Sequence, residues 1–143
     1  MANCSGTVDI IINGKTNHAE GAQLNCDGDC TKGECKERQG KIWYEPDPAD
    51  ARQQMLISET WCSCDEHEPE GCHIVLQKNL TKHTSRVICR GGGCDKGKEC
   101  QPIKVDEKTD HVYQPKKGEH GSGFDVDDNF FILVRLTYAC QCL

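Results

Sequence analysis

Residues 25–35 read Asn-Cys-Asp-Gly-Asp-Cys-Thr-Lys-Gly-Glu-Cys, and residues 89–100 read Cys-Arg-Gly-Gly-Gly-Cys-Asp-Lys-Gly-Lys-Glu-Cys. Each stretch holds three closely spaced cysteines, with a Lys-Gly pair shortly before the third of them. Glycine and aspartate favour turns, so both stretches predict compact loops held by their own cysteines. Two such stretches in one chain point to an internal repeat.

The remaining cysteines extend this pattern in both directions. In each half of the chain a single cysteine precedes the cluster of three, and a Cys-x-Cys pair follows it after a long gap. The acidic, Pro- and Gly-containing segment 65–71 separates the two sets and resembles a short linker. We therefore predict two tandem homologous modules, one over residues 1–66 and one over residues 67–143. Their cysteines are Cys4, Cys26, Cys30, Cys35, Cys62 and Cys64 in the first, and Cys72, Cys89, Cys94, Cys100, Cys140 and Cys142 in the second.

The spacing of the cysteines favours disulfides over a metal site. Their number, 12, is even, as full pairing requires. Zinc sites favour Cys-x2-Cys knuckles, and the sequence has none. A run of possible ligands for zinc or copper does occur between residues 62 and 73. In the second half of the chain, however, Cys140 and Cys142 repeat the Cys-x-Cys pair of this run without a histidine nearby. We expect three disulfides in each module with their pairing left open, and we keep a zinc-binding protein as a weaker alternative. The run comprises Cys62, Cys64, His67, Cys72 and His73.

The composition predicts a small all-β fold rich in disulfides, with antiparallel sheets or sandwiches and long loops. Only 6% of the residues are aromatic and 28% are charged, so the chain has little apolar area for a core. The β-branched run Val8–Ile12 ends at Asn13-Gly14, a strong turn signal. In a strand, both sulfurs of a Cys-x-Cys pair point to the same face. Asp47 and Pro48 predict a brief helical turn over residues 47–54, because they suit its cap and first position.

Charge and hydropathy restrict the partners and the location. The net charge is −6, which argues against a nucleic-acid partner. The longest apolar run, residues 130–134, is far too short to span a bilayer. Residues 1–4 lack the features of a signal peptide. Disulfides are typical of oxidising compartments, so we expect an extracellular or cell-surface protein whose signal peptide is absent from this numbering.

Two loops resemble ligand-binding motifs in part. Residues 92–98 fit the opening of a phosphate-binding loop, but Glu99 stands where a serine or threonine should hold magnesium. Near residue 125 a cluster of oxygen ligands suits calcium chemically, although the spacing of an EF-hand is missing. We therefore favour a solvated acidic loop for that cluster, which comprises Asp125, Asp127, Asp128 and Asn129. The sequence shows no nucleophile motif, so we expect no enzyme and no cofactor.

The segment Phe130-Phe131-Ile132-Leu133-Val134 is long, apolar and β-prone. It fits a central strand of the second module. It also fits an edge strand or apolar patch that pairs with another subunit. If such contacts between subunits did not close into a ring, they would form a filament.

These features favour a non-enzymatic extracellular structural protein, a subunit of a fibre, coat or matrix that assembles with itself. The alternative is a secreted binding module on a disulfide scaffold, recognising a protein, glycan or ion, or acting as an inhibitor. For that alternative the loop from Lys116 to Asp128 is the place where we expect the ligand.

Overall fold

The computed structural model describes residues 3–14, 16, 19–113 and 130–143. Within these ranges the chain forms eight β-strands and no helix, which confirms the predicted all-β class. It follows that no helix long and apolar enough to cross a membrane occurs in these ranges. The strands are β1 (Asn3–Asn13), β2 (Ala19–Asp29), β3 (Lys36–Asp47), β4 (Asp50–Ser63), β5 (His73–Asn79), β6 (Thr84–Arg90), β7 (Cys100–Tyr113) and β8 (Phe130–Cys142).

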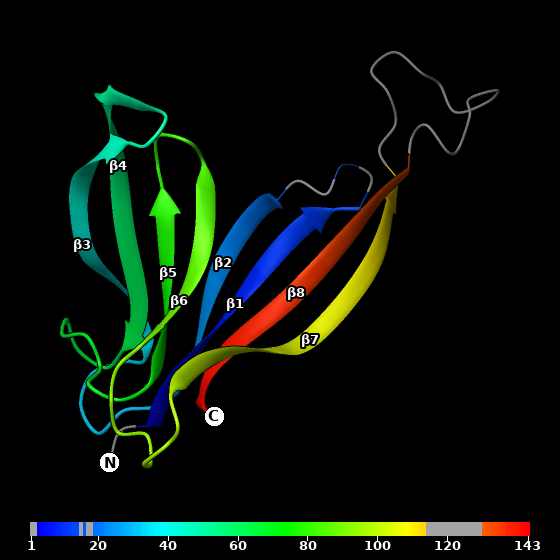
Figure 1. The fold of residues 1–143 in the computed structure, drawn as a ribbon. Helices are drawn as coiled ribbons and strands as arrows, with labels where there is room; N and C mark the ends of the chain where they lie inside the picture. Colours follow the sequence, from blue (N-terminus) through cyan, green and yellow to red (C-terminus); the bar gives the residue numbers. More distant parts are fainter. Residues whose placement is uncertain (1–2, 15, 17–18, 114–129) are drawn as a thin grey trace.

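The strands form two four-stranded sheets whose neighbours pair antiparallel. Sheet A has the order β2-β1-β8-β7, and sheet B has the order β3-β4-β5-β6 (Figure 1). Each sheet therefore joins one hairpin from the first half of the chain to one hairpin from the second half. Neither half forms a four-stranded sheet by itself, and the division into modules at residue 66 stays a prediction.

All twelve cysteines form disulfides. Each bridge connects the two sheets, through cysteines in the strands or in the loops next to them. In both sets the first cysteine pairs with the fourth, the second with the fifth and the third with the sixth. Six disulfides are typical of a protein that folds in an oxidising environment. The bridges are Cys4–Cys35, Cys26–Cys62, Cys30–Cys64, Cys72–Cys100, Cys89–Cys140 and Cys94–Cys142.

The hydrophobic core lies between the sheets at the end where the bridges join them. Its buried members come from both sheets, and three further cysteines, three aliphatic side chains and Tyr138 pack around it. Toward the other end the sheets diverge like the arms of a V (Figure 1). From a core of this size we expect the fold to need the covalent links between the sheets. The buried members are Val8, Leu24, Cys62, Ile74 and Leu76.

The face of sheet B that points away from sheet A is also buried in part. Met55, Ile57, Glu59 and Trp61 alternate along β4 with the residues that face sheet A, and all four are at most 6% exposed. At residues 39–42 a bulge carries β3 across the Trp61 ring. A Cβ atom on Gly40 would lie 2.0 Å from Cζ3 of that ring, so the close approach requires glycine.

The predicted helical turn at residues 47–54 is wrong. Asp47 pairs with Asp50 across a tight turn, and β4 continues directly from it. The Asp47 carboxylate does accept a hydrogen bond from the backbone N–H of Ala49 (2.9 Å), but this bond closes a turn between two strands. The burial of Met55 and Ile57 on one face of β4 outweighs the capping signal, because a helix would scatter these side chains around its axis.

We predict that removing a bridge at the core lowers the free energy of unfolding more than removing a bridge outside it. Cys26–Cys62 and Cys30–Cys64 close segments of similar length, with sequence separations of 36 and 34. The loss of chain constraint is therefore nearly the same for both, about 2–4 kcal/mol. Cys62 also belongs to the core, so Cys26→Ala/Cys62→Ala should lose about 1 kcal/mol more than Cys30→Ala/Cys64→Ala. Urea unfolding of both double variants measures the difference, and equal losses would contradict this account.

Candidate functional site

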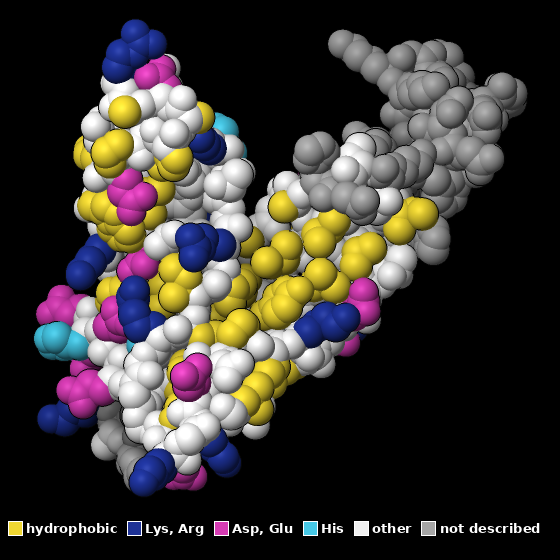
Figure 2. All heavy atoms as spheres, in the orientation of Figure 1, with side chains coloured by type: hydrophobic (Ala, Val, Ile, Leu, Met, Phe, Trp, Pro, Cys, Tyr) yellow, Lys and Arg dark blue, Asp and Glu magenta, His cyan; other side chains and the backbone are white. Residues whose placement is uncertain are grey.

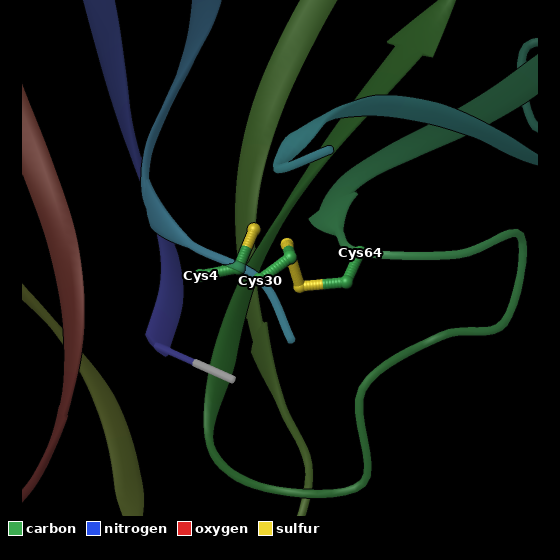
Figure 3. A group of neighbouring side chains, drawn as sticks. All are labelled: Cys4, Cys30 and Cys64. Atoms are coloured by element: carbon green, nitrogen blue, oxygen red, sulfur yellow. A yellow bond between two sulfur atoms is a disulfide. The ribbon is translucent and has the colours of Figure 1, made fainter. Parts of the chain in front are cut away.

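The cysteine sulfurs gather in groups that resemble metal sites by distance alone. Three sulfurs, those of Cys4, Cys30 and Cys64, lie within 4.8 Å of one another, and Figure 3 shows the Cys30–Cys64 bond beside Cys4. Two further triplets occur in the second half of the chain. These sulfurs are bonded in disulfides, and zinc binds thiolates. The groups are therefore places where two bridges stack on each other.

The run of cysteines and histidines near residue 67 is not brought together as a set of ligands. Cys62 and Cys64 bond to cysteines of the first half, and Cys72 bonds to Cys100. His67 is exposed beside Asp65, whereas His73 contacts Glu68.

The segment that resembles a phosphate-binding loop lies between two strands. The Cys94–Cys142 bridge fixes it, and the backbone N–H of Lys98 closes a turn onto the carbonyl of Asp95 (2.9 Å). The next element is β7, so the helix N-terminus that such a loop needs for phosphate is missing here.

Two further predicted sites concern residues 114–129. The candidate calcium ligands Asp125, Asp127, Asp128 and Asn129 lie outside the described residues, as does the loop 116–128.

The apolar segment Phe130–Val134 begins β8, which is an inner strand of sheet A. Leu133 pairs with Asn13 on one side and with Asp110 on the other, and Val134 pairs with Ile12 and Thr109. The outer strands of the two described sheets are instead β2, β7, β3 and β6. The backbone of Leu133 and Val134 is thus already paired on both sides, and only their side chains are left for contacts.

Aliphatic side chains from β1 and β8 line the face of sheet A that points toward sheet B. Ile10 lies opposite Leu136, and Ile12 lies opposite Val134, on the same face as the core residue Val8. Figure 2 shows hydrophobic side chains in rows along this sheet. We call this surface the aliphatic wall; its members are Ile10, Ile12, Ile132, Val134 and Leu136, all half-buried.

The aliphatic wall continues beyond the part where the two sheets pack together. Ile10 still packs against the core, but the other four members are not part of that cluster. On β3, Tyr44 is 68% exposed on the side of sheet B that faces sheet A, so the two sheets are not packed together at that position.

The far face of sheet B forms a second surface, which we call the trough. Residues of β3 and β6, the two outer strands, line the same hollow of about 290 Å³, so the sheet curls around this face. A neighbouring hollow of about 500 Å³ lies beside Trp43, Glu59 and Arg90. The smaller hollow is lined by Glu45, Pro48, Met55, Ile57, Gln77, Asn79, Thr84, Ser85 and Arg86.

A network of charged groups stabilises one end of the trough. The Glu59 side chain is 4% exposed and accepts hydrogen bonds from Arg90 (2.9 and 3.2 Å) and from Gln77 (3.1 Å). Arg90 also donates to Glu68 (2.6 and 2.8 Å), which lies in the segment 65–71. Hydrogen bonds with Glu68 and then Glu59 raise the pKa of Arg90 above its usual value. The buried carboxylate of Glu59 is therefore neutralised by a permanently charged partner.

His73 attaches the same segment to β5. One ring nitrogen contacts the carbonyl of Gly71 (2.6 Å) and the other contacts the carboxylate of Glu68 (2.8 Å). Both partners are acceptors, so the ring makes both bonds only when both nitrogens carry hydrogen. Burial tends to raise the pKa of Glu68, but hydrogen bonds from Arg90 and His73 outweigh this effect and lower it.

The sequence predictions did not include this network. Its residues are far apart in the chain, since Glu59 and Arg90 are separated by 31 positions. One signal was present: Glu59 is the single charged residue in the segment from Met55 to Ser63. A lone charge in an apolar strand needs a partner when it is buried.

No protein-family model matches this chain, and no curated protein or solved structure shows significant similarity to it. The chemistry of its own residues therefore carries the functional proposal.

We predict that Arg90→Met destabilises the protein, because it leaves the buried Glu59 carboxylate without its charged partner. The expected loss is about 2–3 kcal/mol, less than for a fully buried ion pair, because Arg90 is 39% exposed. The double variant Glu59→Gln/Arg90→Met should recover part of this loss. Arg86→Met, on the same strand, should stay within about 0.5 kcal/mol of the native protein. Urea unfolding provides the measurement, and equal losses for the two arginine variants would refute the pairing.

We also predict an acid-sensitive contribution from Glu68. Its pKa is lowered in the folded protein, so the stability it contributes is present above the ordinary glutamate pKa and disappears as the pH falls through the folded value. Between about pH 5 and pH 2, the melting temperature of Glu68→Gln should therefore change less steeply than that of the native protein. Glu66→Gln, at an exposed position in the same segment, should retain the native slope. Identical slopes for Glu68→Gln and the native protein would show that the contacts to Arg90 and His73 are unimportant.

Proposed function

We propose that this protein is a non-enzymatic structural subunit of an extracellular assembly, and that it associates with further copies of itself through the aliphatic wall. The observation that carries the proposal is the row of half-buried aliphatic side chains on sheet A that extends beyond the core.

Burial of apolar surface is the main driving force for association between folded chains. Fully burying one aliphatic side chain contributes about 1.5–3 kcal/mol, and the wall has five that are only half-buried. Contiguous apolar surface of this kind marks contact sites in soluble proteins. A second copy presents the same wall, so two walls facing each other would cover both.

The mode of association that we propose is packing between sheet faces. The backbone of Leu133 and Val134 is already paired on both sides, so these residues cannot add a strand of another subunit. Charged side chains follow one another along the outer strand β7, at Lys104, Asp106, Glu107, Lys108 and Asp110. Charges on an outer strand oppose pairing with a further strand.

The disulfides support both the structural role and the extracellular location. Bridges that connect the sheets resist unfolding and persist in oxidising surroundings. A subunit of a coat or matrix benefits from both properties.

We expect the native protein to form oligomers that depend on concentration, and Ile12→Lys to dissociate them. A lysine at this position would place a charge in the middle of the contact between two walls. Ile11→Lys is the matched control, because the neighbouring side chain on β1 points to the opposite face. Sedimentation velocity across about two decades of protein concentration distinguishes the species. A native protein that stays monomeric, or equal dissociation by both variants, would refute the proposal.

A further inference from the structure

The trough contains an arginine, Arg86, whose charge is not neutralised by any group in the described part of the chain. Arg86 is exposed and lines the smaller hollow, and within the part of the chain that the structure describes its guanidinium makes no ion pair or hydrogen bond. This contrasts with Arg90 on the same strand, whose guanidinium is bonded to two carboxylates. A guanidinium has five donors in a planar arrangement that matches a carboxylate. The unpaired charge therefore suits an anionic group of a ligand.

The groups around Arg86 have further hydrogen-bonding capacity. Gln77 uses its amide nitrogen on Glu59, which leaves its carbonyl oxygen as an acceptor. The Asn79 carbonyl accepts from two backbone N–H groups, and its amide nitrogen makes one weak contact with the Met55 sulfur (3.2 Å), so one amide hydrogen is left. Thr84 adds a hydroxyl at the same hollow. Closely spaced donors and acceptors of this kind match a ligand with several hydroxyl groups.

An aromatic ring lies on the opposite wall of the trough. Trp43 is half-buried, lies opposite Ile57 and lines the larger hollow together with Lys41. Its indole N–H donates to Glu45 (2.7 Å), which fixes the orientation of the ring. A rigid aromatic face is a suitable surface for the apolar C–H face of a sugar ring, whose hydroxyls then point outward to polar groups.

The charges of the trough narrow the choice of anion. Glu59 is neutralised by Arg90, but the Glu45 carboxylate lines the same hollow as Arg86. Glu45 would repel a doubly charged phosphate ester more strongly than a singly charged carboxylate. A carboxylate flanked by hydroxyls would accept hydrogen bonds from Arg86, and the neighbouring hydroxyls would donate to Glu45. Three strand spacings separate β3 from β6, about 14 Å along a flat sheet and less across a curled one. Two linked sugar rings have a length of this order.

We propose that the trough binds an acidic saccharide of the uronic-acid type. The carboxylate of one sugar unit binds Arg86, its hydroxyls bind Gln77, Asn79 and Thr84, and the adjoining unit packs on Trp43. This site is independent of self-association, because it lies on the far face of sheet B and the aliphatic wall belongs to sheet A.

Two disaccharides that differ in one group test the proposal. Cellobiouronate carries a carboxylate where cellobiose carries a hydroxymethyl group. In a two-dimensional ¹H–¹⁵N NMR titration of the whole chain, we expect cellobiouronate to shift the indole N–H of Trp43 and the backbone N–H groups around Arg86. Cellobiose should bind about tenfold or more weakly, because it lacks the charge-assisted bonds.

Arg86→Gln should weaken the binding of cellobiouronate about tenfold and leave that of cellobiose unchanged. Arg135→Gln is the matched control, since Arg135 is an exposed arginine on sheet A.

The absence of shifts in the trough up to about 10 mM cellobiouronate would refute the site. Equal affinities for the two disaccharides, unchanged in Arg86→Gln, would refute the acidic class. Binding by a monomeric protein would leave this inference standing and refute only the proposed assembly.

Discussion

Six disulfides that cross from one sheet to the other are the constraint on which the rest of this structure depends. Among the described residues, the core between the sheets has five buried members, one of them a cysteine, so apolar burial between the sheets contributes little stability. The bridges lie at the end where the sheets meet. They also restrict the conformations of the unfolded chain, which stabilises the folded state. Because the bridges hold that end, the sheets can diverge at the other end without a continuous core.

This arrangement leaves two surfaces with different chemistry. The aliphatic wall of sheet A extends past the core, and its five members are half-buried. The far face of sheet B is instead curled, with a neutralised Glu59–Arg90 pair at one end. Near its other end lies Arg86, which makes no ion pair within the ranges that the structure describes. Both surfaces lie on one scaffold whose two sheets are joined by disulfides.

Local signals in the sequence were reliable where a short stretch carries the physical cause. The β-branched run before Asn13-Gly14 does form β1, and the Cys-x-Cys pairs do send both sulfurs toward the opposite sheet. The turn at Asp47 shows the limit of such signals. Its carboxylate caps a backbone N–H in either structure, and the pairing of β3 with β4 and the burial of Met55 select the hairpin. The network of Glu59 and Arg90 had almost no local signal, because it joins positions on three elements.

The number and spacing of the cysteines, together with the scarcity of apolar residues, were enough to predict a small all-β protein rich in disulfides. These properties follow from the composition and from the two-residue period of a strand, and both can be recognised without knowing which strands become neighbours. The pairing of the cysteines, the sharing of each sheet between the two halves and the inner position of β8 came from the folded chain alone. They depend on which strands become neighbours, and neighbours in a sheet are selected by contacts between residues that the sequence separates by tens of positions.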